Sequence, residues 1–117
     1  MGLQDLSGKR AIITGAAGGI GRAIASALVA EGVRVVVADL DGPAAQQTAA
    51  AIGHGATSVT IDVSNRASVE AAFAKAVAEL GGLDILCANA GVSTMRLVEE
   101  LTDQDWDFNM DVNARGV

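Results

Sequence analysis

The feature that most constrains this chain is a short apolar run that ends in glycines and leads directly into a helical pattern. The run covers residues 11–14, the glycine-rich segment covers residues 15–21, and residues 22–28 then carry apolar side chains at helical spacing. A buried strand that ends in a glycine turn and opens a helix can hold a phosphate, because unpaired N–H groups and the positive end of the helix dipole face the turn. Glycines let the anion approach without a Cβ in the way. The segment therefore predicts a site for the pyrophosphate of a nucleotide.

The spacing of these glycines differs from the commonest dinucleotide fingerprint, G-x-G-x-x-G. Here the order is T-G-x-x-x-G-x-G, formed by Thr14, Gly15, Gly19 and Gly21, with an additional Gly18. A glycine cluster by itself is also compatible with an ordinary tight turn between a strand and a helix. The residues that follow the cluster decide between these two interpretations.

A second β-branched run, residues 33–38, ends in Asp39. A carboxylate at the tip of the second strand, about 20 residues past the glycines, is where a dinucleotide site binds the ribose hydroxyl groups. It would repel the 2′-phosphate of NADP, and neither Gly18 nor Leu40 supplies a cation to offset that repulsion. These residues favour NAD over NADP. The alternative is a solvated carboxylate in a turn beside Asp41.

The composition limits the classes of protein to which this chain can belong. It has 117 residues, 50% of them apolar, and a formal net charge of −6, which suits one globular domain and offers no basic surface for nucleic acid or anionic membranes. The single cysteine, Cys87, and the single histidine, His54, predict neither an internal disulfide nor a metal site. No apolar stretch has the length of a membrane span. We therefore expect a soluble, cytoplasmic domain.

Strand-like and helix-like segments alternate along the rest of the chain. Residues 56–61 and 83–88 are predicted strands, residues 44–52 form a predicted helix, and Ser64 or Asn65 can cap a further helix that ends at Gly81. Such alternation predicts an α/β fold with a Rossmann-type, doubly wound parallel sheet. Right-handed crossovers give the strand order 3-2-1-4 in the part present.

Polar and small residues follow the third and fourth predicted strands. Asp62 and Val63 come directly after the third strand, and Asn89, Ala90 and Gly91 come after the fourth. Ligands of such sheets bind at the carboxyl ends of the strands, near the point where the strand order reverses. Each of these residues, taken alone, is also an ordinary turn residue.

The last predicted helix combines an N-terminal cap with one polar residue on an apolar face. Thr102 is a suitable N-cap, and Asp105 stands where a capping box has its acidic residue. One face of the helix is formed by Trp106, Met110, Asn113 and Val117. An inward amide needs hydrogen-bond partners or costs about 1–3 kcal/mol. Asn113 is thus either a satisfied core residue or a functional one.

Taken together, these motifs resemble the short-chain dehydrogenase/reductase family over essentially the whole chain. Residues 14–21 are similar to its T-G-x-x-x-G-x-G cofactor loop, Asp39 to its NAD-selecting acid, Asp62 and Val63 to its adenine-contacting pair, and residues 89–91 to its N-A-G turn. The resemblance implies cofactor-binding roles for Thr14, Gly15, Gly18, Gly19, Ile20, Gly21, Asp39, Leu40, Asp62, Val63, Asn89, Ala90 and Gly91.

The same resemblance implies a reaction and a catalytic residue. Members of the family transfer a hydride between NAD(H) and a secondary alcohol or ketone, and as full-length proteins they form homodimers or homotetramers. Asn113 is similar to the helix asparagine that orders a water molecule in the proton relay to the catalytic lysine. The substrate expected for this protein is accordingly a small alcohol or ketone.

The family's catalytic serine and its Tyr-x-x-x-Lys pair have no counterpart in residues 1–117. The chain contains no tyrosine, and its last lysine is Lys75. We therefore expect the chain to be the N-terminal, NAD-binding part of an enzyme, inactive alone because the catalytic and substrate-binding part is absent. The alternative is a stand-alone, non-catalytic nucleotide-binding module. A flavodoxin-like domain is a third interpretation, disfavoured because it would not need Asp39.

Overall fold

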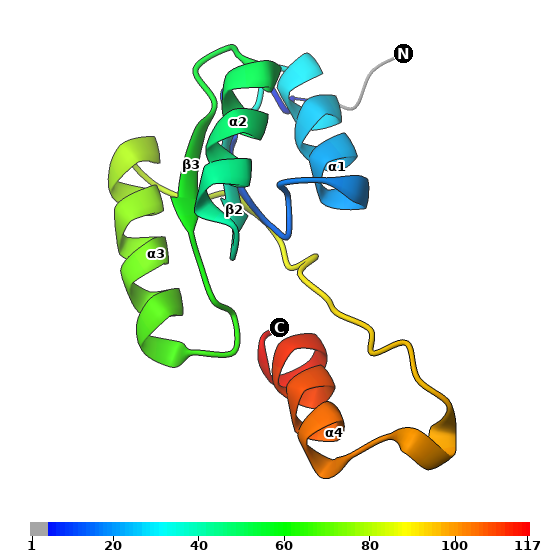
Figure 1. Cartoon of the computed structure of the whole chain (residues 1–117). Coiled ribbons are helices and arrows are strands. Elements are labelled where there is room, and N and C mark those ends of the chain that lie inside the picture. Colours follow the sequence, from blue (N-terminus) through cyan, green and yellow to red (C-terminus); the bar gives the residue numbers. More distant parts are fainter. Residues whose placement is uncertain (1–4) are drawn as a thin grey trace.

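The structure is a computed structural model that describes residues 5–117. A parallel sheet alternates with helices, and a long irregular segment then leads to a separate C-terminal helix (Figure 1). The elements are β1 (Arg10–Thr14), α1 (Gly19–Ala30), β2 (Arg34–Asp39), α2 (Gly42–Ile52), β3 (Thr57–Thr60), α3 (Arg66–Leu80), β4 (Ile85–Cys87), the 3₁₀ turn η1 (Val98–Glu100), α4 (Asp103–Met110) and the π-helical turn η2 (Asp111–Arg115).

The four strands form one sheet in the order β3-β2-β1-β4, and every pairing is parallel. In this register Ile12 of β1 lies opposite Val36 of β2 and Leu86 of β4. The expected strand order, with its reversal beside β1, is thereby confirmed. The crevice that this reversal creates at the carboxyl ends of β1 and β4 is where such sheets bind ligands.

Two hydrophobic cores form because successive strand residues point to opposite faces of the sheet. On one face Ile13, Val35 and Val37 pack with the buried alanines of α1 and α2. On the other face Ile12 and Val36 pack with the buried residues of α3. Both faces of β1 and β2 are therefore covered, as their near-continuous apolar sequences predict.

Polar caps fix where the later helices begin. The Asn65 side chain accepts a hydrogen bond from the backbone N–H of Ser68, so Asn65 rather than Ser64 caps α3. Thr102 and Asp105 form the expected capping box of α4, with bonds of 3.1 and 3.0 Å. Among residues 5–117, no helix is long and apolar enough to cross a membrane.

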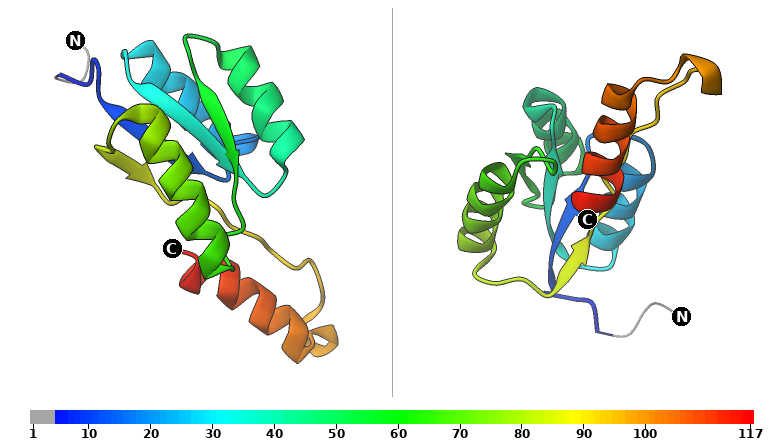
Figure 2. Two further views of the ribbon diagram at one scale, coloured as in Figure 1. Left: turned by 90° about the vertical axis from the view of Figure 1, so that its left-hand side faces the viewer. Right: turned by 90° about the horizontal axis from the view of Figure 1, so that it is seen from below.

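The fourth strand is shorter than residues 83–88, because only Ile85–Cys87 pair with β1. It lies at the edge of the sheet, and Leu86 is 48% exposed. The chain beyond it leaves the sheet, and the segment from residue 92 to α4 projects past the end of the strands (Figure 2). The unpaired backbone N–H and C=O groups of such an edge strand are a site for further strand pairing.

Ionic contacts tie together the opposite, amino end of the sheet. The Arg10 guanidinium binds the Asp84 carboxylate at 2.9 and 3.1 Å and donates to the carbonyl of Gly81. Arg34 donates to the carbonyl of Leu80. Two arginines from neighbouring strands thus satisfy carbonyls at the C-terminus of α3, where the helix dipole favours cations. Hydrogen bonds from the Arg10 side chain and backbone lower the pKa of Asp84 to about 2.

This shift makes Asp84 a testable source of pH-dependent stability. Its pKa is lower in the folded protein than the value of about 3.9 expected for an unfolded chain, so its contribution is present above about pH 4 and is lost as the pH falls towards about 2. We expect Asp84→Asn to unfold at lower urea concentration than the parent at pH 7, and the difference to narrow at pH 3. The control, Glu70→Gln, removes only an exposed ion pair with Arg66 and should change little at either pH. Equal differences at both pH values would contradict this role for Asp84.

Candidate functional site

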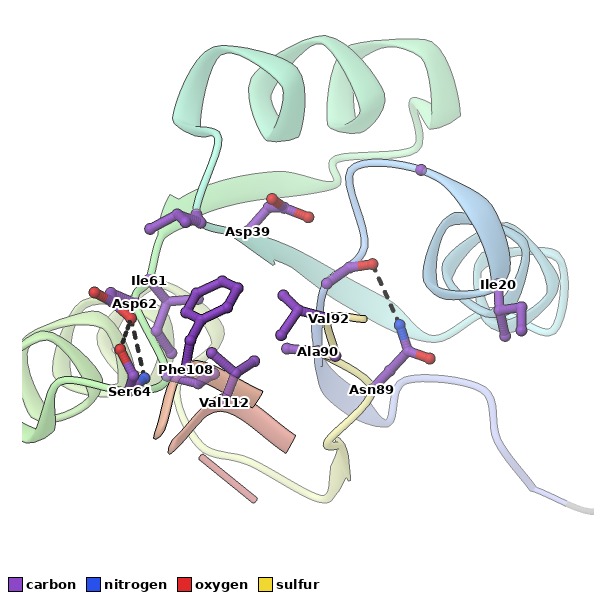
Figure 3. Close-up of a pocket in the computed structure, with 15 residues that line it drawn as sticks. Ile20, Asp39, Ile61, Asp62, Ser64, Asn89, Ala90, Val92, Phe108 and Val112 are labelled. Carbon is purple, nitrogen blue, oxygen red and sulfur yellow. Dashed lines mark hydrogen bonds between the residues drawn. The ribbon is translucent and has the colours of Figure 1, made fainter. Parts of the chain in front are cut away.

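A pocket of about 560 Å³ opens at the carboxyl ends of the strands (Figure 3). The glycine loop, the tip of β2, the segment after β3, the turn after β4 and the C-terminal helical segment all contribute to it. Its lining consists of Gly15, Gly18, Ile20, Asp39, Leu40, Ile61, Asp62, Val63, Ser64, Asn89, Ala90, Gly91, Val92, Phe108 and Val112. A cleft of this size and position is suited to a small-molecule ligand.

The glycine loop presents open backbone to the pocket. Helix α1 begins at Gly19, and no side chain caps its N-terminus at Gly18. A Cβ built on either glycine would have no atom within 4 Å. The first N–H groups of α1 are thus free to receive an anion.

One side of this loop is held by the turn after β4. The buried Thr14 hydroxyl donates to the carbonyl of Cys87 at 3.4 Å and accepts from the backbone N–H groups of Asn89 and Ala90 at 3.0 and 3.1 Å. The Asn89 side-chain amide donates to the carbonyls of Thr14 and Gly15, both at 3.2 Å, and Figure 3 draws the second of these bonds. Thr14 therefore acts behind the pocket, where it joins β1 to β4.

The tight fit of this junction explains two of the glycines. Gly15 has a φ of +65°, and its Cβ would lie 2.9 Å from the Cα of Ala90. A Cβ on Gly21 would meet the carbonyl oxygen of Gly15 and would lie 2.6 Å from Nδ2 of Asn89. Gly21 thus lets the first turn of α1 pack against the loop, and it lies outside the pocket lining.

The other side of the loop is held by β2. The Asp39 carboxylate accepts from the backbone N–H of Ala17 at 3.1 Å and from that of Asp41 at 3.0 Å. A carboxylate has about four lone-pair positions, so Asp39 keeps acceptor capacity towards the pocket. Its position at the tip of β2, beside the glycine loop, is the one that the sequence predicted.

The pocket is electrostatically acidic, because its lining contains the carboxylates of Asp39 and Asp62 and no lysine, arginine or histidine. The Asp62 carboxylate accepts from the backbone N–H and the hydroxyl of Ser64, at 3.0 and 2.6 Å. Asp62 therefore stabilises the turn after β3, and Val63 beside it adds apolar surface to the pocket. The negative charges of Asp39 and Asp62 are unfavourable for a 2′-phosphate in their part of the pocket.

The C-terminal helical segment covers the pocket through a different face from the one expected. Trp106 is 67% exposed and Val117 is 74% exposed, whereas Val112 is 8% exposed and lies with Phe108 against the segment after β3 (Figure 3). All four residues of the predicted face, Trp106, Met110, Asn113 and Val117, are exposed among residues 5–117, and the role of Asn113 stays a prediction. The π-helical turn η2 changes the helical register after Met110, so the apolar spacing of a regular helix does not continue.

Asn113 is exposed, and its side-chain amide bonds to both backbone groups of Val92. Its Oδ1 accepts from the backbone N–H of Val92, and its Nδ2 donates to the carbonyl of Val92, both at 2.8 Å. This pair of bonds joins η2 to Val92, which lies in the irregular segment between β4 and η1. The side chain thereby satisfies its partners without burial in an apolar core.

The structure brings most of the predicted cofactor-binding residues to one pocket. Of the predicted set, the lining omits Thr14, Gly19, Gly21 and Asn113, which hold or adjoin its walls. Sequence reasoning missed five lining residues: Ile61, Ser64, Val92, Phe108 and Val112. The i, i+4 spacing of Phe108 and Val112 was a signal for a second apolar face, and the others adjoin motifs that were recognised.

The chain is similar to known dehydrogenases in sequence. A family model described as "short chain dehydrogenase" matches residues 9–117. The sorbitol dehydrogenase of Cereibacter sphaeroides is 41% identical over 95% of this chain and 43% of that protein. The D-threitol dehydrogenase of Mycolicibacterium smegmatis is 45% identical over 95% of this chain and 44% of that protein. The chain thus spans less than half the length of these relatives.

Solved structures share the fold. A 3-ketoacyl-(acyl-carrier-protein) reductase from Brucella melitensis, complexed with NADH, superposes with a TM-score of 0.92 at 38% identity, over 97% of this chain and 47% of that one. A short-chain dehydrogenase/reductase from Burkholderia phymatum in complex with NAD gives 0.90 at 35% identity, over 97% of this chain and 42% of that one. The chain belongs to the short-chain dehydrogenase family.

Alanine substitutions at Gly21 and Gly18 distinguish a glycine that is required for close packing from one whose Cβ position is open. In Gly21→Ala the new Cβ would lie 2.9 Å from the Cα of Ala16 and against the carbonyl of Gly15, so we expect a loss of about 1–3 kcal/mol in the free energy of unfolding. Gly18→Ala adds a Cβ in open space on an extended backbone, with a φ of −161°, and should cost less stability than Gly21→Ala, because only the preference of a helix N-cap for glycine over alanine is lost. Thermal and urea unfolding measure both; a stable Gly21→Ala would refute the close packing.

Proposed function

We propose that this chain is the NAD(H)-binding part of an oxidoreductase that interconverts a secondary alcohol and a ketone by hydride transfer. The observation that carries the proposal is the Asp39 carboxylate, fixed at the tip of β2 by the Ala17 and Asp41 N–H groups, beside an open glycine loop in a pocket without cations. Such an arrangement accepts hydrogen bonds from a free ribose 2′-hydroxyl and disfavours a 2′-phosphate.

The residues of the pocket fit a dinucleotide from one end to the other. Gly18 and Gly19 leave open the space that the pyrophosphate would occupy at the N-terminus of α1. Leu40 and Val63 offer apolar surface for the adenine ring, and Asp39 precedes Leu40 in the chain and bonds to the loop at the N–H of Ala17. The turn at Asn89 borders the remaining part of the pocket. When bound, the nicotinamide ring supplies the position that accepts or donates the hydride.

The individual assignments follow from this placement. We propose direct contacts with NAD from the predicted residues that line the pocket, and a supporting role for Thr14 and Gly21, which hold the loop from behind. Gly19 is proposed to meet the pyrophosphate through its backbone. Asn113 is proposed to position the irregular segment after β4 through its bonds to Val92. Its role in ordering a relay water remains a prediction from the family resemblance.

The relatives support the reaction class and the view that this chain is one part of a longer enzyme. Proteins named sorbitol and D-threitol dehydrogenase match it over less than half of their own length, and these names support an alcohol or ketone substrate. We propose that the catalytic and substrate-binding part lies in the length of those relatives that this chain does not cover. The complete enzyme is proposed to form a homodimer or homotetramer, as the family resemblance implies, and to work in the cytoplasm, whose reducing conditions suit the single Cys87.

Asp39 provides the test of the cofactor. In the complete enzyme, Asp39→Ala combined with Leu40→Arg should lower kcat/KM for NAD and raise kcat/KM for NADP, because the ribose acceptor is lost and a cation that can bind the 2′-phosphate is gained. A hydrogen bond to a charged group contributes about 1.5–3 kcal/mol, so the NAD/NADP ratio should change by at least about tenfold. Asp41→Ala removes a neighbouring acid that only caps α2 and should keep the parent ratio. An unchanged ratio in the double variant would refute the assignment.

The 117-residue chain by itself tests the proposal that catalysis requires a further part of the enzyme. We expect it to oxidise no alcohol with NAD above background, because it contains no tyrosine to act as the family's acid/base. We also expect it to associate through β4, whose outer edge is unpaired among the described strands. Sedimentation and NADH absorbance measure the two properties. A monodisperse monomer that reduces NAD with an alcohol would show that no further part is needed.

A further inference from the structure

Two polar side chains are buried among residues 5–117, Thr14 at 4% exposure and Thr48 at 2%. Thr14 joins β1 to the turn after β4, as described above. Thr48 lies in the middle of α2 and does not line the pocket. A buried hydroxyl needs a hydrogen-bond partner, and the partner of Thr48 lies in the glycine loop.

The Thr48 hydroxyl donates to the carbonyl oxygen of Ala17 at 2.7 Å, across 31 positions of sequence. The backbone N–H of Ala17 donates to the Asp39 carboxylate at 3.1 Å. One residue of the loop is thus held on its amide side by β2 and on its carbonyl side by α2. Ala17 immediately precedes Gly18, which has no atom near its Cβ position, so these two bonds are the last fixed points before the open stretch of the loop.

Packing alone does not require the hydroxyl group at this position. The neighbouring buried residues of α2 are Ala45 and Ala49, and both belong to the apolar core between the sheet and α1. A valine has the shape of a threonine and would fill the same space. The polar atom therefore serves the loop, because without it the Ala17 carbonyl would lose its donor.

We propose that Thr48 is a positioning residue for the cofactor: it fixes the peptide of Ala17, and through it both the glycine loop and the orientation of the Asp39 carboxylate. This inference rests on the proposed binding of NAD to the pocket. It assigns to α2, which does not line the pocket through Thr48, a part in the affinity for the dinucleotide that acts through the glycine loop. The effect acts on cofactor binding and not on the reacting atoms.

The experiment uses the complete enzyme and titrates NAD by calorimetry. Thr48→Val should weaken NAD binding about five- to tenfold, the change that corresponds to one lost hydrogen bond. The KM for NAD should rise by a similar factor, and kcat should stay within about twofold, as expected when only binding is lost. Thr48→Ser keeps the hydroxyl and should restore most of the affinity. Thr57→Val removes a hydroxyl bond to Glu79 on the exposed side of β3 and should leave NAD binding unchanged.

A double-mutant cycle tests whether Thr48 acts through Ala17. Thr48 and Asp39 hold the same residue, so Thr48→Val and Asp39→Asn should be non-additive in their effect on the Kd for NAD. Asp62 bonds to Ser64 and shares no partner with Thr48, so Asp62→Asn combined with Thr48→Val should be additive. Additivity in both cycles would overturn the proposed route.

The remaining outcomes separate this inference from the proposed function. A parent enzyme that binds NAD, with a Thr48→Val variant that binds it equally well, would overturn the positioning role and leave the function intact, even if the variant melts at a lower temperature. A folded parent that binds no NAD would overturn both. Should Thr48→Val not fold, the comparison of Thr48→Ser with Thr48→Ala carries the test, and equal affinity of these two would overturn the role.

Discussion

The hydroxyl group of Thr14 joins the carboxyl ends of β1 and β4 at the point where the strand order of the sheet reverses. It accepts two backbone N–H groups from the turn after β4 and donates to the carbonyl of Cys87, so its full hydrogen-bonding capacity is used. Because these bonds form away from water, the loss of one would leave a buried polar group unpaired. The glycine loop and the turn at Asn89 are therefore fixed relative to each other without the help of a ligand, which is the condition for a preformed binding site.

The two ends of the sheet differ in the forces that they use. At the amino end, Arg10 and Arg34 bind Asp84 and the last carbonyls of α3 through charged contacts. At the carboxyl end, the walls of the pocket are held mainly by hydrogen bonds of peptide groups to Thr14, Asp39 and other uncharged or acidic side chains. Basic residues are thus used where they stabilise the fold, while the pocket lining contains none. The residues at the two ends share no hydrogen-bond partners, so the effects of their substitutions on the free energy of unfolding should be additive.

The parts of the structure that sequence could predict are those governed by local patterns. The strand order follows from the alternation of strand and helix patterns. The position of Asp39 follows from its place at the end of the second strand, after the glycine-rich segment. The orientation of the last helix could not be predicted, because it depends on a π-helical turn and on a contact between Asn113 and Val92 that are 21 positions apart. The role of Thr48 could not be predicted either, since a threonine within a helix gives no sign that its hydrogen-bond partner is Ala17 in a distant loop.

The two bonds that the Asp39 carboxylate makes within the protein constrain how this fold can change its cofactor. The acceptor proposed for the ribose also binds the N–H of Ala17 and that of Asp41, so a substitution that admits a 2′-phosphate also releases the loop proposed to hold the pyrophosphate. A lineage that exchanged NAD for NADP would pass through an intermediate with weak affinity for both, unless a compensating donor or acceptor near Ala17 appeared first. The order of substitutions, and not only their identity, is therefore limited by one shared carboxylate.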